Sequence, residues 1–196
     1  INHGLAEHAA RYGRIAKVLA ARGFHVYAHD HRGHGYTKVP GVSLGQFSKQ
    51  DGCQRVLDDT LFVRNLARQN HPGLPLILFG HSMGGSIAMN SALRDPDNIA
   101  ALAVWNANFS AGALGRLAQL LLGIEKMLLG SDVPSIMLPK LTFQEWAKKV
   151  PNARTGFDWL SRDPDEVDKY IADPLCGWDS SVSMWQDVFR LIFAGA

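Results

Sequence analysis

No histidine follows position 81 in this chain of 196 residues, and all eight histidines lie at or before that position. Cysteine is scarce: Cys53 and Cys176 are far apart in sequence, which argues against a disulfide framework and for a reduced interior. We therefore expect a cytoplasmic location. The net charge is only +2, too small to indicate a nucleic-acid partner. The longest apolar runs, such as LLLGI, are far too short to span a membrane.

What is present is ordinary for a soluble globular protein, with 46% hydrophobic and 19% charged residues. The expected elements are a helix through Tyr12, Ile15 and Leu19 that ends at Gly23, a strand at 24–30, a helix at 53–69, a strand at 74–79, a small-residue helix after Ser82, and a strand at 99–106. Strands that alternate with helices predict a mostly parallel sheet covered by helices. From about residue 109 the alternation of strands and helices ends, and we expect a mostly helical insertion.

A serine at a strand-to-helix junction is the strongest chemical signal. The stretch LILFGHSMGGSIA (76–88) places the motif G-H-S-M-G around Ser82 directly after an apolar strand and directly before a helix. A nucleophile elbow lies at such a junction, because its strained serine needs small neighbours and the helix N-terminus favours a developing negative charge. The alternative is a glycine-rich turn that carries a surface serine.

Acyl transfer also requires two backbone N–H groups that bind the oxyanion. Met83, the residue after the candidate nucleophile, supplies one of them. The second donor often comes from a loop after an earlier strand that carries His-Gly, which here makes Leu5, after His3 and Gly4, the candidate. Taken alone, the His-Gly pair is an ordinary turn.

Four histidines gather in the stretch HVYAHDHRGHG: His25, His29, His31 and His34. Neutral imidazole is the commonest metal ligand in proteins, so their density raises the question of a metal site. No further His or Cys cluster with ligand spacing accompanies them, and we expect a structural role in which Asp30 and Arg32 hold a loop beside the active site. No metal and no organic cofactor is expected.

Three stretches together resemble a known family. HGLAEHAARY, AHDHRGHG and GHSMGGSIA, in that order, are similar to the α/β-hydrolase superfamily and, more narrowly, to the monoacylglycerol lipase / lysophospholipase group, which includes serine aminopeptidase-like sequences. EVDKYIADPLC (166–176) also resembles that group. The resemblance implies the α/β-hydrolase fold, Ser82 as nucleophile, Leu5 and Met83 as oxyanion donors, and a helical cap. We divide the chain into a partial core (1–108), a cap (109–185) and the start of a return to the core (186–196).

The resemblance also accounts for the missing histidine. In this superfamily the triad runs Ser, Asp, His, and the last two follow strands that come after the cap. The chain stops at RLIFAGA, so we expect it to be the middle of a larger protein in which the triad Asp and His lie beyond these residues. The earlier histidines are poor substitutes because their order is wrong, and we interpret Asp158, Asp163 and Asp165 as solvated charge.

The expected function is hydrolysis of carboxylic esters of monoacyl lipids through an acyl-enzyme on Ser82. The alternatives are an amide or peptide hydrolase on the same scaffold, and a non-catalytic relative that binds a small apolar ligand. An apolar stripe in the insertion (Leu117, Leu121, Ile124 and Leu128, at helical spacing) is expected either to pack into the core or to form an acyl-binding cap. A transient contact of this cap with a membrane surface is the other partner that we expect.

Overall fold

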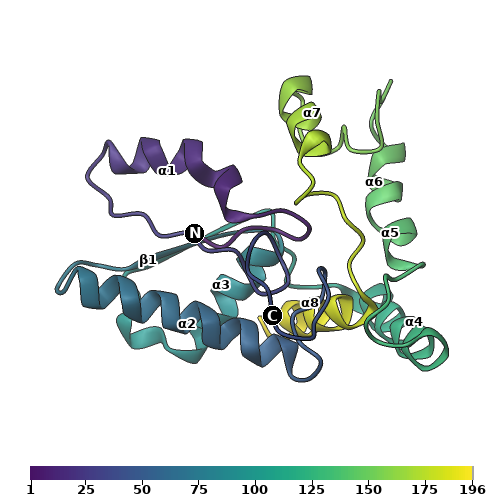
Figure 1. The fold of residues 1–196 in the computed structure, drawn as a ribbon, viewed down its shortest axis with the longest axis horizontal. Coiled ribbons are helices and arrows are strands. Elements are labelled where there is room, and N and C mark those ends of the chain that lie inside the picture. The colour runs from purple at the N-terminus through teal and green to yellow at the C-terminus, as the bar shows by residue number, and fades with distance from the viewer. Residues whose placement is uncertain (196) are drawn as a thin grey trace.

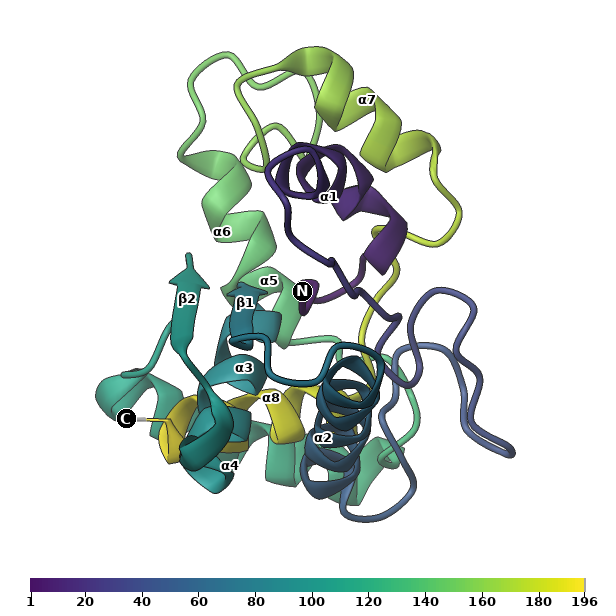
Figure 2. The ribbon, with the colours of Figure 1, turned by 90° about the vertical axis from the view of Figure 1, so that its left-hand side faces the viewer.

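The computed structural model describes residues 1–195. Its elements, in chain order, are α1 (Gly13–Ala20), α2 (Gly52–Asn70), β1 (Ile77–His81), α3 (Met83–Arg94), β2 (Ala101–Trp105), α4 (Gly112–Leu129), α5 (Leu138–Leu141), α6 (Phe143–Lys148), α7 (Pro164–Ala172) and α8 (Val182–Ala194), with 3₁₀ turns at Ala9–Tyr12 and Pro96–Asn98. Helices α2, α3 and α8 lie on one side of the strands and α1 on the other, while α5, α6 and α7 extend away from α4 and α8 (Figures 1 and 2). Within the described residues, no helix is long and apolar enough to cross a membrane.

The sheet is parallel, as the alternation of strands and helices predicts. β1 pairs with β2, with Ile77 opposite Ala101 and His81 opposite Trp105. Parallel strands need a crossover connection, which α3 supplies. On the other edge of β1, Asn2 forms a bridge to Gly80 and donates its N–H to the carbonyl of Phe79 at 2.8 Å. This bridge brings the His-Gly stretch next to the end of β1.

Two strand predictions need correction. The strand expected at 24–30 takes no place in a ladder; the amino group of Ile1 donates to the Tyr27 carbonyl at 2.7 Å, but no strand runs alongside to pair the rest. β1 starts at Ile77 instead of residue 74, because Pro75 has no N–H to donate to a ladder. Strand propensity alone does not form a strand, because pairing depends on the neighbours that the fold brings alongside.

The main core lies between α2, α3 and α8. Helix α2 is confirmed almost to the residue, and its buried face carries Val56, Thr60 and Ala67, as its spacing predicts. Arg64 lies on the same face, where its guanidinium donates to the Ser91 carbonyl at 2.8 Å and to Asp95 Oδ2 at 2.8 Å. The apolar cluster that these helices share consists of Phe47, Val56, Leu57, Met83, Ile87, Met184, Val188 and Leu191. Met83 thus anchors the start of α3 in the core.

Of the two expectations for the apolar stripe of α4, packing into the core is wrong. The buried face of α4 is a different one, formed by Gly115, Leu122 and Glu125, and it packs against α8. Leu117 is 51% exposed and Leu128 is 71% exposed. Periodicity predicted an amphipathic helix correctly, but α4 is apolar nearly all round, and only the neighbouring α8 decides which side becomes buried.

Four histidines form a cluster, in which His3, His31 and His34 are buried and His29 is half-buried. Their rings lie close together, with centroid distances of 4.4 Å for His3–His31, 4.8 Å for His29–His31 and 5.1 Å for His3–His34. His3 Nε2 accepts a hydrogen bond from the His31 N–H at 2.9 Å. Burial, aided by the neighbouring His3, lowers the pKa of His29 to about 4 and that of His34 to about 3. The cluster is therefore neutral at neutral pH.

We expect this cluster to make the fold sensitive to acid. An unfolded histidine titrates near pH 6.5, above the folded pKa of His29 and His34, so the unfolded chain binds protons first and stability falls as the pH drops below about 6.5. At about pH 5 each of the two residues accounts for a loss of about 2 kcal/mol. Urea unfolding at about pH 7.5 and about pH 5 measures this loss. The variant His34→Gln should lose less than the parent between these pH values.

Gln69→Ala, at an exposed residue of α2 that does not titrate and lies outside the cluster, is the control and should keep the pH dependence of the parent. An unfolding free energy that is equal at both pH values would contradict the prediction.

Candidate active site

Ser82 lies at the sharp turn between β1 and α3, as the G-H-S-M-G motif predicts. Its backbone is at φ 54° and ψ −124°, a strained combination for a residue with a side chain. The turn is held by hydrogen bonds from the Ser82 N–H to the Trp105 carbonyl and from the Gly85 N–H to the Ser82 carbonyl, both at 2.9 Å. The Ser82 side chain is half-buried, and among residues 1–195 its hydroxyl has no hydrogen-bond partner. The hydroxyl is thus presented at the end of the strand without a competing contact.

The glycines beside Ser82 are required by close packing. A Cβ atom on Gly84 would lie closer than 3.0 Å to the carbonyl oxygens of Asn2 and His3. A Cβ on Gly80 would lie equally close to the Gly84 carbonyl. The backbone of the elbow therefore touches the His-Gly loop, and any side chain at these positions would push the two apart.

We expect Gly84→Ala to destabilise the protein, because the new methyl group meets rigid backbone on two sides. Overpacking of this kind costs about 1–3 kcal/mol, and the shift that relieves it displaces Ser82 from the His-Gly loop. Chemical denaturation and initial rates of ester hydrolysis measure the two effects. Gly123→Ala, in α4, is the matched control: its Cβ meets nothing within 4 Å, so it should be neutral or stabilising by up to about 1 kcal/mol. Equal effects of the two variants would contradict the packing argument.

The candidate oxyanion donors lie on the two segments that meet at Ser82. Met83 is the first residue of α3, where a backbone N–H has no acceptor within the helix. Leu5 follows Gly4, and a Cβ on Gly4 would lie 3.4 Å from the Cβ of Ser82. Within the described residues, neither N–H donates to a protein acceptor. The sequence-predicted residues Leu5, Ser82 and Met83 are thus gathered at one turn.

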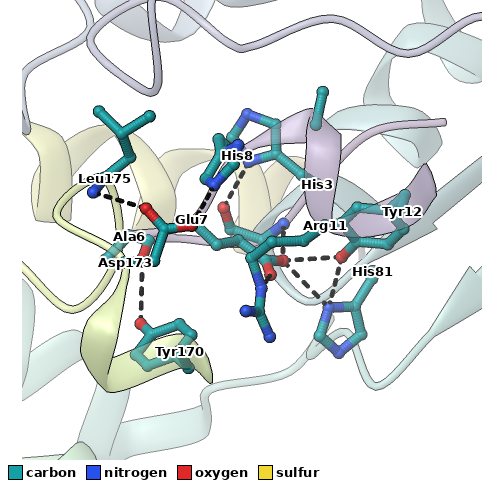
Figure 3. Close-up of polar contacts among 12 residues, drawn as sticks. His3, Ala6, Glu7, His8, Arg11, Tyr12, His81, Tyr170, Asp173 and Leu175 are labelled. Carbon is teal, nitrogen blue, oxygen red and sulfur yellow. Dashed lines mark hydrogen bonds and ion pairs between the residues drawn. The ribbon is translucent and has the colours of Figure 1, made fainter. Parts of the chain in front are cut away.

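Glu7 holds the His-Gly loop in place, a role that the sequence analysis missed. Its Oε1 accepts hydrogen bonds from the Gly4 N–H at 2.6 Å and from the Tyr12 hydroxyl at 2.7 Å, and its Oε2 accepts from Arg11 Nε at 3.1 Å. The Tyr12 hydroxyl and His81 Nδ1 are 2.9 Å apart, which closes the network (Figure 3). Glu7 lies within the stretch HGLAEHAARY, and its position three residues after Gly4 was the sequence signal for this contact.

The carboxylate of Glu7 is charged as well as buried. Burial alone would raise its pKa, but hydrogen bonding with His81 and from Tyr12 and the Gly4 N–H outweighs burial and lowers the pKa to about 2. Glu7 is therefore ionised throughout the neutral range, and its contacts with the loop are charge-assisted. Burial, followed by the charge of Glu7, raises the pKa of Tyr12, which stays a hydrogen-bond donor.

A second contact holds the same loop from the side of α7. Ala6, at φ 53°, has its carbonyl turned toward the Tyr170 hydroxyl and the Gly177 N–H, both of which donate to it at 2.9 Å. Beside it, His8 Nε2 and Asp173 Oδ2 are 2.7 Å apart (Figure 3). EVDKYIADPLC therefore contacts HGLAEHAARY directly, although the two stretches lie far apart in sequence.

The histidines before Ser82 have other partners, and none is hydrogen-bonded to its hydroxyl within residues 1–195. His81 is next to Ser82 in sequence, yet its Nδ1 faces Tyr12 and Glu7. His25 stacks on His71 with ring centroids 3.7 Å apart, away from the cluster of the other three histidines of its stretch. No general base is therefore assigned among the described residues.

The carboxylates of the insertion are not all plain solvated charge, which corrects that interpretation. Asp158 accepts hydrogen bonds from the Thr155 hydroxyl at 2.6 Å and from the Arg154 N–H, and so ties a turn. Asp163 caps α7 by accepting from the Asp165 N–H at 3.0 Å. Asp163 and Asp165 are exposed, as expected.

Comparison with known proteins identifies the family of this chain. Residues 1–193 match the family model described as Serine aminopeptidase, S33. The chain belongs to this family. The α/β-hydrolase resemblance read from HGLAEHAARY, AHDHRGHG and GHSMGGSIA is thereby confirmed, together with the fold class.

Among similar proteins, the monoacylglycerol lipase of Mycolicibacterium smegmatis is 34% identical over 173 residues, which is 88% of this chain and 54% of that protein. The monoglyceride lipase homolog of Monkeypox virus is 32% identical over 89% of this chain and 55% of its own length. The monoglyceride lipase of Homo sapiens is 31% identical over 89% of this chain and 50% of its own length. The chain thus spans about half the length of the relatives that it matches.

Solved structures show the same fold. A carboxyl esterase from Bacillus coagulans superimposes with a TM-score of 0.84 at 22% identity, covering 98% of this chain and 62% of that one. The monoacylglycerol lipase of Paleococcus ferrophilus gives a TM-score of 0.68 at 25% identity, covering 99% of this chain and 65% of that one. The arrangement of helices around β1 and β2 is therefore that of an α/β hydrolase.

Proposed function

We propose that this chain supplies the nucleophile and the oxyanion-binding backbone of a serine hydrolase that cleaves carboxylic esters of monoacyl lipids. The observation that carries the proposal is the strained Ser82 beside the backbone N–H groups of Leu5 and Met83. Within residues 1–195, neither the Ser82 hydroxyl nor these two N–H groups have a hydrogen-bond partner. The names of the relatives, which are monoacylglycerol and monoglyceride lipases, support the choice of substrate class.

In the proposed reaction, Ser82 Oγ attacks the acyl carbonyl carbon while its proton passes to a general base. The carbonyl oxygen becomes an oxyanion, which the N–H groups of Leu5 and Met83 and the N-terminus of α3 stabilise. The tetrahedral intermediate then expels the alcohol, which takes the proton from the base. Water next attacks the acyl-enzyme in the same way and releases the carboxylic acid and free Ser82.

The cap is proposed to comprise residues 109–185 and to meet the lipid. Helix α4 exposes apolar side chains over much of its length, and Ile136 (56% exposed) and Leu141 (55% exposed) are further exposed apolar residues just before and in α5. The surface of α4 consists of Leu114, Leu117, Leu120, Ile124, Met127 and Leu128. Such a patch on one helix marks a contact with a lipid surface or an apolar ligand. We therefore propose that it binds the aggregated substrate.

We expect the double variant Leu117→Asp, Leu128→Asp to lose activity on monoacylglycerol in micelles or vesicles by about 10-fold or more, because both exposed side chains leave the lipid contact. Hydrolysis of a short water-soluble ester should change less than about 2-fold, since the chemistry at Ser82 is untouched. The measurement is kcat/KM of the full-length protein on both substrates. Tyr36→Asp, at a residue 79% exposed outside this surface, is the control and should change neither rate.

An equal loss of kcat/KM on both substrates would mean that the exposed surface of α4 supports the fold and does not bind lipid. The alternative of amide or peptide hydrolysis, which the name of the family favours, is tested with the same protein and an aminoacyl anilide. A kcat/KM for the anilide above that for the monoacylglycerol would replace the ester proposal.

A further inference from the structure

One group of three metal-ligating side chains comes together among residues 1–195, next to the proposed active site and separate from Ser82. It consists of His8, Asp173 and Cys176, whose ligand atoms all lie within 4.8 Å of one another. His8 is buried, and the two others are half-buried. His8 comes from the loop that follows Leu5, whereas Asp173 and Cys176 come from the turn after α7. The group therefore joins two segments more than 160 positions apart in the chain.

We propose that His8, Asp173 and Cys176 form a zinc-binding site that fastens the turn after α7 to the loop that carries Leu5. An imidazole, a carboxylate and a thiolate are the side chains that zinc prefers, and three protein ligands with a water molecule as the fourth complete a tetrahedron. Thiolate and imidazole together favour zinc over the harder magnesium or calcium ions. The site is independent of the proposed hydrolysis and stands even if Ser82 is not a nucleophile.

The distances suit an ion after a small adjustment. His8 Nε2 and Asp173 Oδ2 are 2.7 Å apart, which is hydrogen-bond distance (Figure 3). Around tetrahedral zinc, ligand atoms are separated by about 3.3–3.6 Å, as follows from bond lengths of about 2.0–2.3 Å. His8 and Asp173 must therefore separate slightly, and Cys176 must approach by at most about 1.3 Å, a movement within the reach of a change in side-chain torsion.

Charge and protons balance in this site. On binding, the Cys176 thiol loses one proton to solvent, and the proton on His8 Nε2 moves by way of solvent to Nδ1, so that Nε2 becomes a ligand. The doubly charged ion then faces one carboxylate and one thiolate, and the site is neutral. Nearby Arg11 is already paired with Glu7 at 3.1 Å, which limits its repulsion of the cation.

The surroundings also orient the ligands. The second oxygen of Asp173 accepts the N–H of Leu175 at 2.9 Å, which fixes the carboxylate plane, a contact typical of ligating carboxylates.

The test is a titration of the full-length, reduced protein with Co²⁺ and then Zn²⁺. Cobalt should produce the intense near-ultraviolet absorption of a thiolate ligand, and zinc should abolish it at one equivalent. Cys176→Ser should lose the band and weaken zinc binding by about 100-fold or more. Cys53→Ser, at the other cysteine, which lies outside this group, is the matched control and should keep both signals.

Alkylation of the unaltered protein provides a second reading in case a variant fails to fold. With zinc present, Cys176 should react with iodoacetamide about 10-fold or more slowly than without it, while Cys53 should react equally in both conditions, as peptide mass spectrometry measures. No thiolate band with cobalt, a band that depends on Cys53, or no protection of Cys176 would each overturn the site. His8 and Asp173 would then form a hydrogen-bonded pair only.

Discussion

Ser82→Ala should abolish labelling by a fluorophosphonate probe and lower kcat for ester hydrolysis by about 10⁶-fold in the full-length protein. This substitution removes only the hydroxyl group of Ser82, and alanine tolerates the strained backbone of the elbow as well as serine does. The fold should therefore be unchanged, and the free energy of unfolding should stay within about 0.5 kcal/mol of the parent. Probe labelling on gels and initial rates of fatty acid release measure the loss.

Ser110→Ala is the control for this experiment, because Ser110 is an exposed serine that lies outside the elbow. It should label and hydrolyse like the parent. Labelling that survives in Ser82→Ala would show that another serine is the nucleophile and would overturn the proposed function.

The second large effect is expected at Glu7, a positioning residue for the oxyanion donors. Glu7→Ala leaves the Gly4 N–H without its acceptor and frees the loop that carries Leu5. Losing one oxyanion donor lowers kcat by about 10²–10³-fold, and a displaced loop should approach about 100-fold. KM should change by less than about 3-fold, because Glu7 acts on the transition state through the backbone and not on the bound acyl chain.

Glu7→Gln separates positioning from simple structural support. Its amide oxygen can still accept the Gly4 N–H, so it should retain kcat within about 10-fold of the parent. Glu145→Ala, at an exposed glutamate of α6, is the matched control and should leave kcat unchanged. Glu7 does not have this role if Glu7→Ala keeps its kcat. The same holds if kcat falls, KM rises and thermal stability is lost together.

The candidate site was predictable from the sequence because its residues belong to short, local patterns. The turn at Ser82 needs a strand before it, a helix after it and glycines beside it, and each of these requirements shows in the twelve or so residues around the serine. The same is true of α2, whose buried face repeats every three to four positions over its whole length.

The contacts that stabilise the site were not predictable in this way. Glu7 reaches Gly4 only because Ala6 takes a left-handed backbone, and that conformation is held by Tyr170 and Gly177 from the other end of the chain. Nothing in a local pattern reports a partner that lies more than 160 positions away. The expected strand at 24–30 was wrong for a related reason, since pairing depends on a neighbour and not on propensity.

The sequence by itself determined the strand-to-helix turn at Ser82, the candidate donors Leu5 and Met83, the parallel α/β class and the helical nature of α2, α3 and α4. These depend on backbone geometry and periodicity, which neighbouring residues specify. Only the tertiary structure decided which face of α4 is exposed, where the histidines lie, how Glu7 holds the His-Gly loop, and how His8 and Asp173 join the two halves of the chain. Those outcomes follow from burial and pairing between distant segments, whose free energy exists only once the segments are in contact.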